Sequence, residues 1–238
     1  MQGFASTKQL FLDLLFPAFC AGCGSEGAVF CDACRALLLF IPPSCFVCKK
    51  LVPPADGVPA GRTCAPCRKK SRIYAFFSPF SYDAAGVRTL VHDLKYRRMQ
   101  GNAAILAGML YRAIAYHGVV LSRHALIVPI PLYKARERVR GFNQARLIAH
   151  ALGTRMGIPV RADILLKTKK TAPQMALRRE ERLTNLVGAF AVSDTESVRN
   201  RTIILMDDIK TTGTTLEEAA KVLKAAGAKR IWAITVAH

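Results

Sequence analysis

A run of apolar residues that ends in two acids constrains this chain more than any other feature. Residues 203–206 read Ile-Ile-Leu-Met, and Asp207 and Asp208 follow directly. Such a run predicts a strand in the middle of a sheet, and the carboxyl end of such a strand is where open α/β sheets bind their ligands. The two carboxylates are therefore expected in a ligand site. There they can accept hydrogen bonds from vicinal sugar hydroxyls or hold a water of a bound magnesium ion.

The segment after the two acids is rich in small and hydroxyl-bearing residues. Residues 210–215 read Lys-Thr-Thr-Gly-Thr-Thr. Such a loop can turn its backbone N–H groups inward around an anion, helped by the positive end of the helix that follows. Gly213 lets the backbone approach closely, where a side chain would be in the way. The acids and the loop together predict a site for a phosphorylated sugar.

The residues that follow predict a complete βαβ unit. Residues 216–223 are apolar at helical spacing, and Gly227 is suited to end the helix. Two overlapping Thr-x-x-Glu pairs, which begin at Thr214 and Thr215, are typical of a helix start. Residues 231–236 then predict another buried strand. Two strands joined by a helix in this way lie parallel, so the sequence predicts an α/β domain.

Eight cysteines form four Cys-x-x-Cys pairs near the start of the chain. Each pair can supply two thiolates to one tetrahedral ion, so four pairs are enough for two closed Cys₄ zinc sites. The segment is rich in Gly and Pro, and a small module of that kind needs a metal or disulfides to fold. The predicted ligands are Cys20, Cys23, Cys31, Cys34, Cys45, Cys48, Cys64 and Cys67.

Two ways of pairing the knuckles remain open. In the sequential pairing the first four cysteines hold one ion and the last four hold another, as in tandem zinc ribbons. In the interleaved pairing alternate knuckles share an ion in a cross-brace. We favour the sequential pairing because the knuckles at 20–23 and 31–34 resemble the two halves of one ribbon. A zinc ion held by four cysteines usually stabilises the fold and takes no part in catalysis. The alternative is that the zinc module contacts nucleic acid or docks a partner protein.

Composition limits the partners and the compartment. The formal net charge of +19 favours anionic partners, namely phosphosugars, nucleic acid or an anionic membrane, without choosing among them. The apolar stretch at 10–19 is interrupted by Asp13 and Pro17 and is too short to span a bilayer. We therefore expect no membrane insertion and a cytoplasmic location, where thiols stay reduced and can bind metal.

The middle of the chain predicts alternating strands and helices. Residues 74–82 predict a strand and hairpin, and residues 126–130 predict a strand followed by a basic stretch. Basic side chains and free N–H groups at a strand end suit a pyrophosphate. Helices are expected over 86–96, 103–116 and 143–156. Residues 167–185 are polar and basic and lie between strands expected at 164–166 and 189–192, which predicts a functional loop or a partly helical lid.

The stretch with the two acids closely resembles the phosphoribosyl pyrophosphate (PRPP) loop of the type I phosphoribosyltransferases. That motif is an apolar run, two acids, two variable residues and Thr-Thr-Gly-x-Thr. The resemblance implies that Asp207 and Asp208 bind the ribose hydroxyls, whereas Lys210 falls at a variable position and inherits no role. It also implies that the 5-phosphate is held by Thr211, Thr212, Gly213, Thr214 and Thr215. The alternative is a solvated Asp-Asp turn before an ordinary helix. A P-loop is excluded because no Gly-x-x-x-x-Gly-Lys occurs.

The order of motifs along the chain resembles the ComF family of bacterial competence proteins and their gluconate-associated relatives. After the cysteine pairs come His92-Asp-Leu-Lys-Tyr96, Val128-Pro-Ile-Pro-Leu132, Arg140-Gly-Phe-Asn-Gln144, Thr171-x-x-Gln174 and the PRPP loop. The resemblance implies a double zinc-ribbon module over 1–72 and a type I phosphoribosyltransferase fold, mainly parallel α/β, over 73–238. It also implies PRPP binding and a role in taking imported single-stranded DNA to the chromosome, with a helicase or a recombination mediator of the competence machinery as a partner.

The first functional hypothesis is a magnesium-dependent phosphoribosyltransferase. A nucleophile would displace pyrophosphate at C1 of the ribose, with catalysis mostly by positioning and charge neutralisation. Asp207 and Asp208 would hold the ribose. Arg136 and Arg140, with Lys95 in addition, would neutralise the leaving pyrophosphate. No residue stands out as a general base, so the acceptor stays open.

The second hypothesis is a binding protein without catalysis. PRPP would then be a regulatory ligand, and the zinc ribbons with the basic surface would hold single-stranded DNA or act as an adaptor. The net charge supports this reading, and the DNA affinity should then fall steeply with salt. A helper role in gluconate or nucleotide metabolism is a third alternative, and it rests only on the family's mixed naming.

Overall fold

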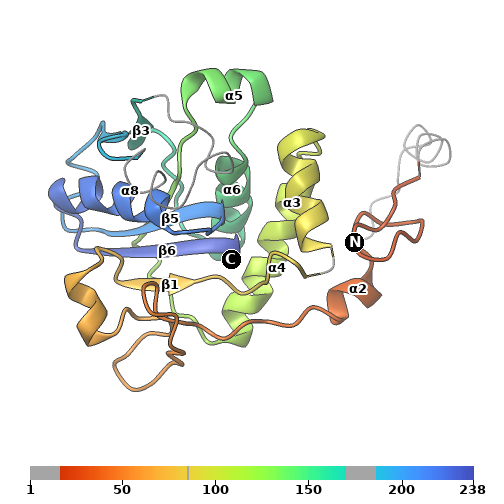
Figure 1. Ribbon diagram of the computed structural model, residues 1–238, viewed down its shortest axis with the longest axis horizontal. Coiled ribbons are helices and arrows are strands. Elements are labelled where there is room, and N and C mark those ends of the chain that lie inside the picture. Colours follow the sequence, from red (N-terminus) through yellow and green to blue (C-terminus); the bar gives the residue numbers. More distant parts are fainter. Residues whose placement is uncertain (1–16, 85, 170–185) are drawn as a thin grey trace.

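A four-stranded parallel sheet forms the centre of the molecule (Figure 1). The computed structural model describes residues 17–84, 86–169 and 186–238. The strand order is β1 (Ala75–Phe77), β6 (Arg230–Ala237), β5 (Thr202–Ile209) and β2 (Leu126–Pro129). Every neighbouring pair is parallel. β5 is therefore an inner strand, as its apolar sequence predicts.

The βαβ unit at the end of the chain is confirmed. β5 leads into α8 (Thr214–Ala225), which returns the chain to β6 beside β5. α8 ends before Gly227, whose φ of +93° fits the left-handed position that commonly follows a helix. The expected start of the helix is right, but neither Thr-x-x-Glu pair caps it. Gly213 is the N-cap and no side chain supplies a capping hydrogen bond.

Two hydrophobic cores cover the two faces of the sheet. One contains residues of α3 (Val87–Tyr96), α4 (Asn102–Tyr116) and α6 (Gln144–Met156), and the other contains residues of α8. Successive side chains of β5 alternate between them, because neighbouring residues of a strand point to opposite faces. Ile204 and Met206 belong to the first core, and Ile203 and Leu205 to the second.

The strand and hairpin expected over 74–82 are partly wrong. β1 forms, but it pairs in parallel with β6, and Phe80 makes a further parallel bridge to Ala237. All three residues of β1 are buried, and Phe76 and Phe77 face different cores. The segment is thus an edge strand of the parallel sheet and not half of a hairpin. The segment mixes aromatic and small polar residues, a composition that fits both a hairpin strand and an edge strand of a parallel sheet.

The basic stretch after β2 forms a short helix, α5 (Lys134–Arg140). The strands expected at 164–166 and 189–192 are β3 (Leu165–Lys167) and β4 (Phe190–Val192), which pair antiparallel in a separate two-stranded sheet. Most of the loop expected between them, residues 170–185, lies outside the described residues. The three long helices expected in the middle of the chain are confirmed within one residue at each end.

The cysteine segment packs against both cores. Its first part carries α2 (Asp32–Ala36) and contributes Cys20 and Phe30 to the core of α3 and α4. Its second part carries the short 3₁₀ helix η1 (Ala65–Lys69) and contributes Phe46 to the core of α8. In Figure 1, α2 lies beside α3 and α4 at the right, and the orange second part lies next to β1 at the lower left. A domain division after residue 72 stays a prediction.

Candidate functional site

The two acids lie at the carboxyl end of β5, beside the C-terminal end of α3. Asp208 is buried, and its carboxylate forms an ion pair with Nζ of Lys95. Burial alone would lower the pKa of Lys95, but the Asp208 carboxylate raises it above its ordinary value. Asp207 is partly accessible and accepts a hydrogen bond from the backbone N–H of Asp208 at 2.8 Å. Burial and the neighbouring carboxylate of Asp208 raise the pKa of Asp207 well above its ordinary value.

Arginines of α5 lie near these acids, and the guanidinium of Arg140 interacts with the Asp208 carboxylate. Arg140 is buried, donates to Oε1 of Gln144, and holds its guanidinium carbon 5.7 Å from the centroid of the Tyr96 ring. Burial and the charge of Arg136 lower the pKa of Arg140, while the Asp208 carboxylate opposes the shift. Arg136 itself is exposed. The structure therefore brings the two predicted arginines, Lys95 and the acids into one electrostatic neighbourhood.

Lys167 is a cation of this site that the sequence did not identify. It ends β3, is half-buried, and lies with its Nζ 5.7 Å from the centroid of the Phe190 ring. Burial and Arg136 lower the pKa of Lys167, and the Asp207 carboxylate opposes that shift. In the sequence Lys167 stands in a basic cluster with Lys169 and Lys170, which reads equally well as solvated surface. Only the position at a strand end could have distinguished it.

The charges of this group suit a strongly anionic ligand. Three cationic side chains each interact with at least one of the two carboxylates, namely Lys95, Arg140 and Lys167. Arg136 acts on both Arg140 and Lys167, so the cations of this group are in excess. A pyrophosphate group can bind cations of this kind through charge-assisted hydrogen bonds. The two acids at the strand end can meanwhile accept hydrogen bonds from hydroxyl groups.

The loop from 211 to 215 leads directly into α8. Oγ1 of Thr212 lies 2.9 Å from Oγ1 of Thr214, and the Thr214 N–H points to Oγ1 of Thr212 at 3.4 Å. Gly213, with a φ of +83°, turns the chain into the helix. Thr211 and Thr212 are exposed, whereas Gly213 and Thr214 are buried. Thr215 is half-buried in the first turn of α8. The loop thus lies at the N-terminus of a helix, where backbone N–H groups can bind an anion.

A cavity of about 730 Å³ adjoins this loop. Its walls come from both the loop with α8 and the second part of the cysteine segment. The lining residues are Phe46, Val47, Lys49, Lys70, Ser71, Val187, Lys210, Thr211, Thr212, Gly213, Thr214, Glu217, Glu218 and Lys221. Asp207 and Asp208 are not among them, so the cavity lies beside the loop and away from the acids.

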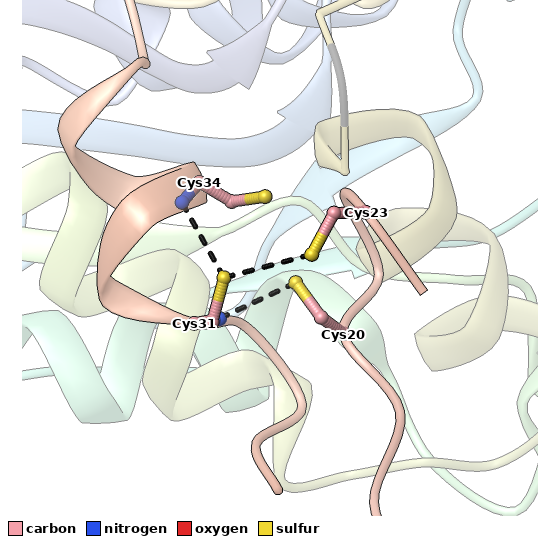
Figure 2. Close-up of side chains that lie close together, drawn as sticks. All are labelled: Cys20, Cys23, Cys31 and Cys34. Atoms are coloured by element: carbon pink, nitrogen blue, oxygen red, sulfur yellow. Dashed lines mark hydrogen bonds between the residues drawn. The ribbon is translucent and has the colours of Figure 1, made fainter. Parts of the chain in front are cut away.

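The eight cysteines form two groups in the sequential arrangement. Within each group the four sulfur atoms lie within 4.8 Å of one another, so the favoured pairing is confirmed and the interleaved one is wrong. Figure 2 shows the four side chains of the first group pointing toward one another. The groups are Cys20, Cys23, Cys31 and Cys34, and Cys45, Cys48, Cys64 and Cys67.

The geometry of both groups fits zinc. Sulfurs bound to one zinc at about 2.3 Å occupy the corners of a tetrahedron, about 3.8 Å apart. Sulfur–sulfur distances of 3.7 Å join Cys23 to Cys31 and Cys45 to Cys64. Backbone N–H groups also point at sulfur, among them that of Cys31 to Cys20 at 3.3 Å (Figure 2).

In the first knuckle of each group the local electrostatics favour a thiolate, the form that binds metal. In the second knuckle the neighbouring cysteines raise the pKa of Cys34 and of Cys67 to about 12. Burial alone would raise the pKa of Cys20, but surrounding N–H groups, including that of Cys31, lower it to about 6. In the second group the pKa of Cys45 falls to about 6 for the same reason, with N–H groups of Cys48 and Cys64 among the donors. Zinc in these closed sites would hold the segment together and supply no catalytic position.

The helices within 17–84, 86–169 and 186–238 are all too short or too polar to cross a bilayer.

Comparison with known proteins agrees with the motifs. A phosphoribosyl transferase domain model matches residues 139–238. Competence protein F of Haemophilus influenzae is 31% identical over 218 residues, which cover 89% of this chain and 86% of that protein. The DNA utilization protein YhgH of Salmonella typhi is 30% identical over 203 residues, or 80% and 88% of the two chains. Competence protein ComFC of Bacillus subtilis is 41% identical over 103 residues, or 42% and 39%.

The match to competence protein F covers 89% of this chain, so it includes residues of both the cysteine segment and the parallel α/β sheet. The phosphoribosyltransferase type of fold is thereby confirmed, and a domain of that type implies binding of PRPP, generally with magnesium. The chain belongs to the ComF family, whose members here include competence protein F and the YhgH proteins, and it carries a phosphoribosyl transferase domain.

Proposed function

We propose that this protein binds PRPP with magnesium at the carboxyl end of β5 and transfers its phosphoribosyl group to an acceptor. The observation that carries the proposal is the arrangement at that strand end. Two carboxylates and a glycine-containing hydroxyl loop follow one strand, and cations from α3, α5 and β3 surround them. This is the set of groups that a sugar carrying both a phosphate and a pyrophosphate requires.

Each part of the site has a role in this proposal. Asp207 and Asp208 accept hydrogen bonds from the ribose hydroxyls, and the loop from Thr211 to Thr215 holds the 5-phosphate. When PRPP binds, a ribose hydroxyl shares Asp208 with Lys95. Magnesium, when bound with PRPP, neutralises oxygen charge on the pyrophosphate.

The chemical step breaks one bond and forms another at C1. The C1–O bond to pyrophosphate breaks, and its electron pair leaves with the pyrophosphate. A lone pair of the acceptor forms the new bond to C1. Arg136, Arg140 and Lys167 stabilise the charge that develops on the leaving group. The proton of the acceptor leaves with solvent or with the pyrophosphate, because the proposal assigns no side chain as general base.

Release of pyrophosphate tests the catalytic part. The protein is incubated with PRPP, magnesium and a panel of acceptors that includes free nucleobases and single-stranded DNA. Acceptor-dependent release that disappears in Asp207→Asn/Asp208→Asn supports transfer. A variant that releases pyrophosphate as fast as wild type places the chemistry elsewhere. The double variant is chosen because asparagine keeps the shape of the side chain and removes its charge.

A second candidate function follows from the charge and from the relatives. The relatives are named as competence and DNA utilization proteins, and this chain carries a formal net charge of +19. We propose as the alternative a cytoplasmic, PRPP-regulated protein that binds single-stranded DNA without catalysis, or an adaptor for a helicase or a recombination mediator. Direct phosphate contacts make DNA affinity fall by orders of magnitude between low and moderate salt. Fluorescence anisotropy with labelled single strands measures that dependence, and a flat salt response contradicts direct binding.

A further inference from the structure

Lys210 is a buried cation beside the phosphate loop. Only 7% of its surface is exposed, yet it lines the cavity next to the loop. Its Nζ lies 5.0 Å from the centroid of the Phe46 ring and 5.1 Å from that of Phe76. Within the described part of the chain no carboxylate pairs with it. Burial and Lys49 lower the pKa of Lys210 and outweigh Cys45, an anionic neighbour that raises it. A buried ammonium without a paired carboxylate is unfavourable, so an anion is expected to complete this arrangement.

Phe46 ties Lys210 to the loop. A Cβ atom on Gly213 would lie 2.7 Å from Cζ of Phe46 and 3.1 Å from Cε of Lys210. The ring, the glycine backbone and the lysine stem therefore form one packed unit, with no room for even a methyl group. Phe46 directly follows Cys45, the first ligand of the second cysteine group. The position of Lys210 thus depends on the fold of that group.

A second contact joins the same part of the cysteine segment to α8. Glu217 accepts a hydrogen bond from Oγ of Ser71 at 2.6 Å and another from the backbone N–H of Arg72 at 2.7 Å. Lys49 and Lys70 line the cavity from the same side. Among the described residues neither has an ion-pair partner, whereas the acid Glu218 is already paired with Lys221. The wall that the cysteine segment supplies is therefore basic.

Within residues 17–84, 86–169 and 186–238, no hydrogen bond, ion pair or ring contact joins the first cysteine group to the loop. Phe30 of the first group packs against Gly86, where a Cβ atom would lie 2.5 Å from the ring. Cys20 and Phe30 belong to the core of α3 and α4, on the other face of the sheet from α8. The two groups therefore differ in what their folding can affect, which provides an internal control.

We propose that Lys210 binds the phosphate group held at the 211–215 loop, and that the second cysteine group positions it there, so that zinc in this group and phosphate at the loop bind cooperatively. The inference rests on the proposed PRPP site and extends it to a residue at a variable position of the motif. Cooperativity of this kind is reciprocal. Zinc in the second group raises the affinity for phosphate, and phosphate raises the affinity for zinc by the same factor.

Lys210 has one competing role. Four thiolates around one Zn²⁺ leave a net negative charge, and Lys210 could serve only as its counter-charge through Phe46 and Cys45. Under that reading Lys210→Met weakens zinc retention and leaves phosphate affinity unchanged. Under ours it leaves zinc bound and weakens phosphate binding.

The direct test is calorimetric titration with PRPP and, separately, with inorganic phosphate. Wild type is compared with Lys210→Met, Lys210→Arg and Phe46→Leu, with zinc counted by atomic absorption. A charge-assisted hydrogen bond corresponds to an affinity loss of about 10- to 100-fold when it is removed. We expect a loss of that size for Lys210→Met with zinc retained, a smaller loss for Phe46→Leu, and partial rescue by Lys210→Arg. Wild-type affinity in Lys210→Met with zinc retained overturns the inference, and so does zinc loss at unchanged affinity.

A matched pair of cysteine variants tests the coupling. Cys23 and Cys48 are each the second cysteine of a knuckle, and both are exposed. We expect Cys48→Ser to lower phosphate affinity and Cys23→Ser to leave it unchanged. In wild type, phosphate should slow one of two phases of zinc release to a chromogenic chelator, and Phe46→Leu should abolish that slowing. If Cys48→Ser and Cys23→Ser change phosphate affinity equally, the coupling is contradicted. It is also contradicted if phosphate changes the rate of neither phase of zinc release.

The outcomes separate this inference from the function on which it rests. If Asp207→Asn/Asp208→Asn loses PRPP while Lys210→Met and Cys48→Ser bind it like wild type, the inference fails and the proposed function stands. If wild type binds no PRPP, the proposed function fails. The titration with inorganic phosphate then decides the role of Lys210 alone.

Discussion

Lys95 and Asp208 form an ion pair that joins the C-terminal end of α3 to the carboxyl end of β5. The Asp208 side chain is 5% exposed and that of Lys95 is 19% exposed. The pair therefore links a helix from the middle of the chain to the strand that carries the ligand-binding acids. It also places a cation beside one of those acids in a buried position.

Removing the cation from this pair should destabilise the protein. Lys95→Met leaves a buried, uncompensated carboxylate, and loss of one partner of a buried pair costs about 3 kcal/mol or more. Urea denaturation measures the change. Adding Asp208→Asn to Lys95→Met should recover part of the loss, because the buried charge is then gone.

The control for this prediction is the ion pair between Arg199 and Glu196, whose side chains are 64% and 78% exposed. Arg199→Met should change the free energy of unfolding by less than about 1 kcal/mol, as is usual for exposed pairs. Similar effects of Lys95→Met and Arg199→Met would mean that burial gives the Lys95–Asp208 pair no additional contribution to stability.

Asp207 should destabilise the apo protein at neutral pH. Its pKa is raised in the folded state by burial and by Asp208, so the folded protein holds this proton more tightly than the unfolded chain. Stability from this group is therefore full below the unfolded pKa and is lost as pH rises toward the folded pKa. Asp207→Asn should increase the free energy of unfolding at neutral pH, and the gain should shrink on acidification.

Asp163 provides a control of opposite sign. Arg161 lowers the pKa of Asp163, so its contribution is present at neutral pH and is lost as pH falls through the folded pKa. Asp163→Asn should thus give no gain at neutral pH. Urea titrations of both variants between about pH 3 and 8, a range that includes the ordinary Asp pKa of about 3.9, make the comparison. A neutral-pH loss of stability in Asp207→Asn contradicts the assignment.

Gly213→Ala should damage both the fold and the site. An alanine there would adopt a φ of +83° and place its Cβ 2.7 Å from Cζ of Phe46. The left-handed conformation alone costs about 1–2 kcal/mol. The clash should add about 1–3 kcal/mol, as overpacking does. Gly118 has a φ of +58° with open space around it, so Gly118→Ala isolates the backbone term. Equal thermal shifts for the two variants would rule out the packing contribution of Phe46.

Zinc content should be two ions per chain, because the cysteines form two complete groups of four. Removal of zinc with a chelator should lower the melting temperature of the whole protein, since Cys20 and Phe30 belong to one main core and Phe46 to the other. Atomic absorption and differential scanning calorimetry make the measurement. A zinc-free protein that melts at the same temperature would contradict a structural role.

Elements whose partners are close in sequence could be predicted from the local sequence pattern. β5, α8 and β6 were predictable because an apolar run, a helical apolar face and a second run follow one another within 36 residues, from Thr202 to Ala237. The sequential cysteine groups were also favoured from local pattern, because the knuckles at 20–23 and 31–34 resemble the two halves of one ribbon. The failure over 74–82 has a physical cause as well. A buried edge strand of a parallel sheet takes its partner from the far end of the chain, and nothing local specifies that partner.

The parts of the site that the sequence missed depend on distant contacts. Glu217 bonds Ser71 and Arg72, more than 140 residues earlier, and so does not cap α8 as its Thr-x-x-Glu spacing suggests. Lys167 packs against Phe190, and Lys210 packs against Phe46. In the sequence Lys167 is one of a basic cluster and Lys210 falls at a variable position of the motif, so neither contact could be predicted. Tertiary packing determines where these side chains lie, and a single sequence does not show that packing.

The most direct test of the account is a calorimetric titration of PRPP with magnesium into zinc-loaded wild type and into Asp207→Asn/Asp208→Asn. The account predicts saturable binding by wild type that the double variant loses while it remains folded and zinc-loaded. Equal affinity in the two proteins would contradict the placement of PRPP at the end of β5. No binding by the folded, zinc-loaded wild type would contradict the function itself.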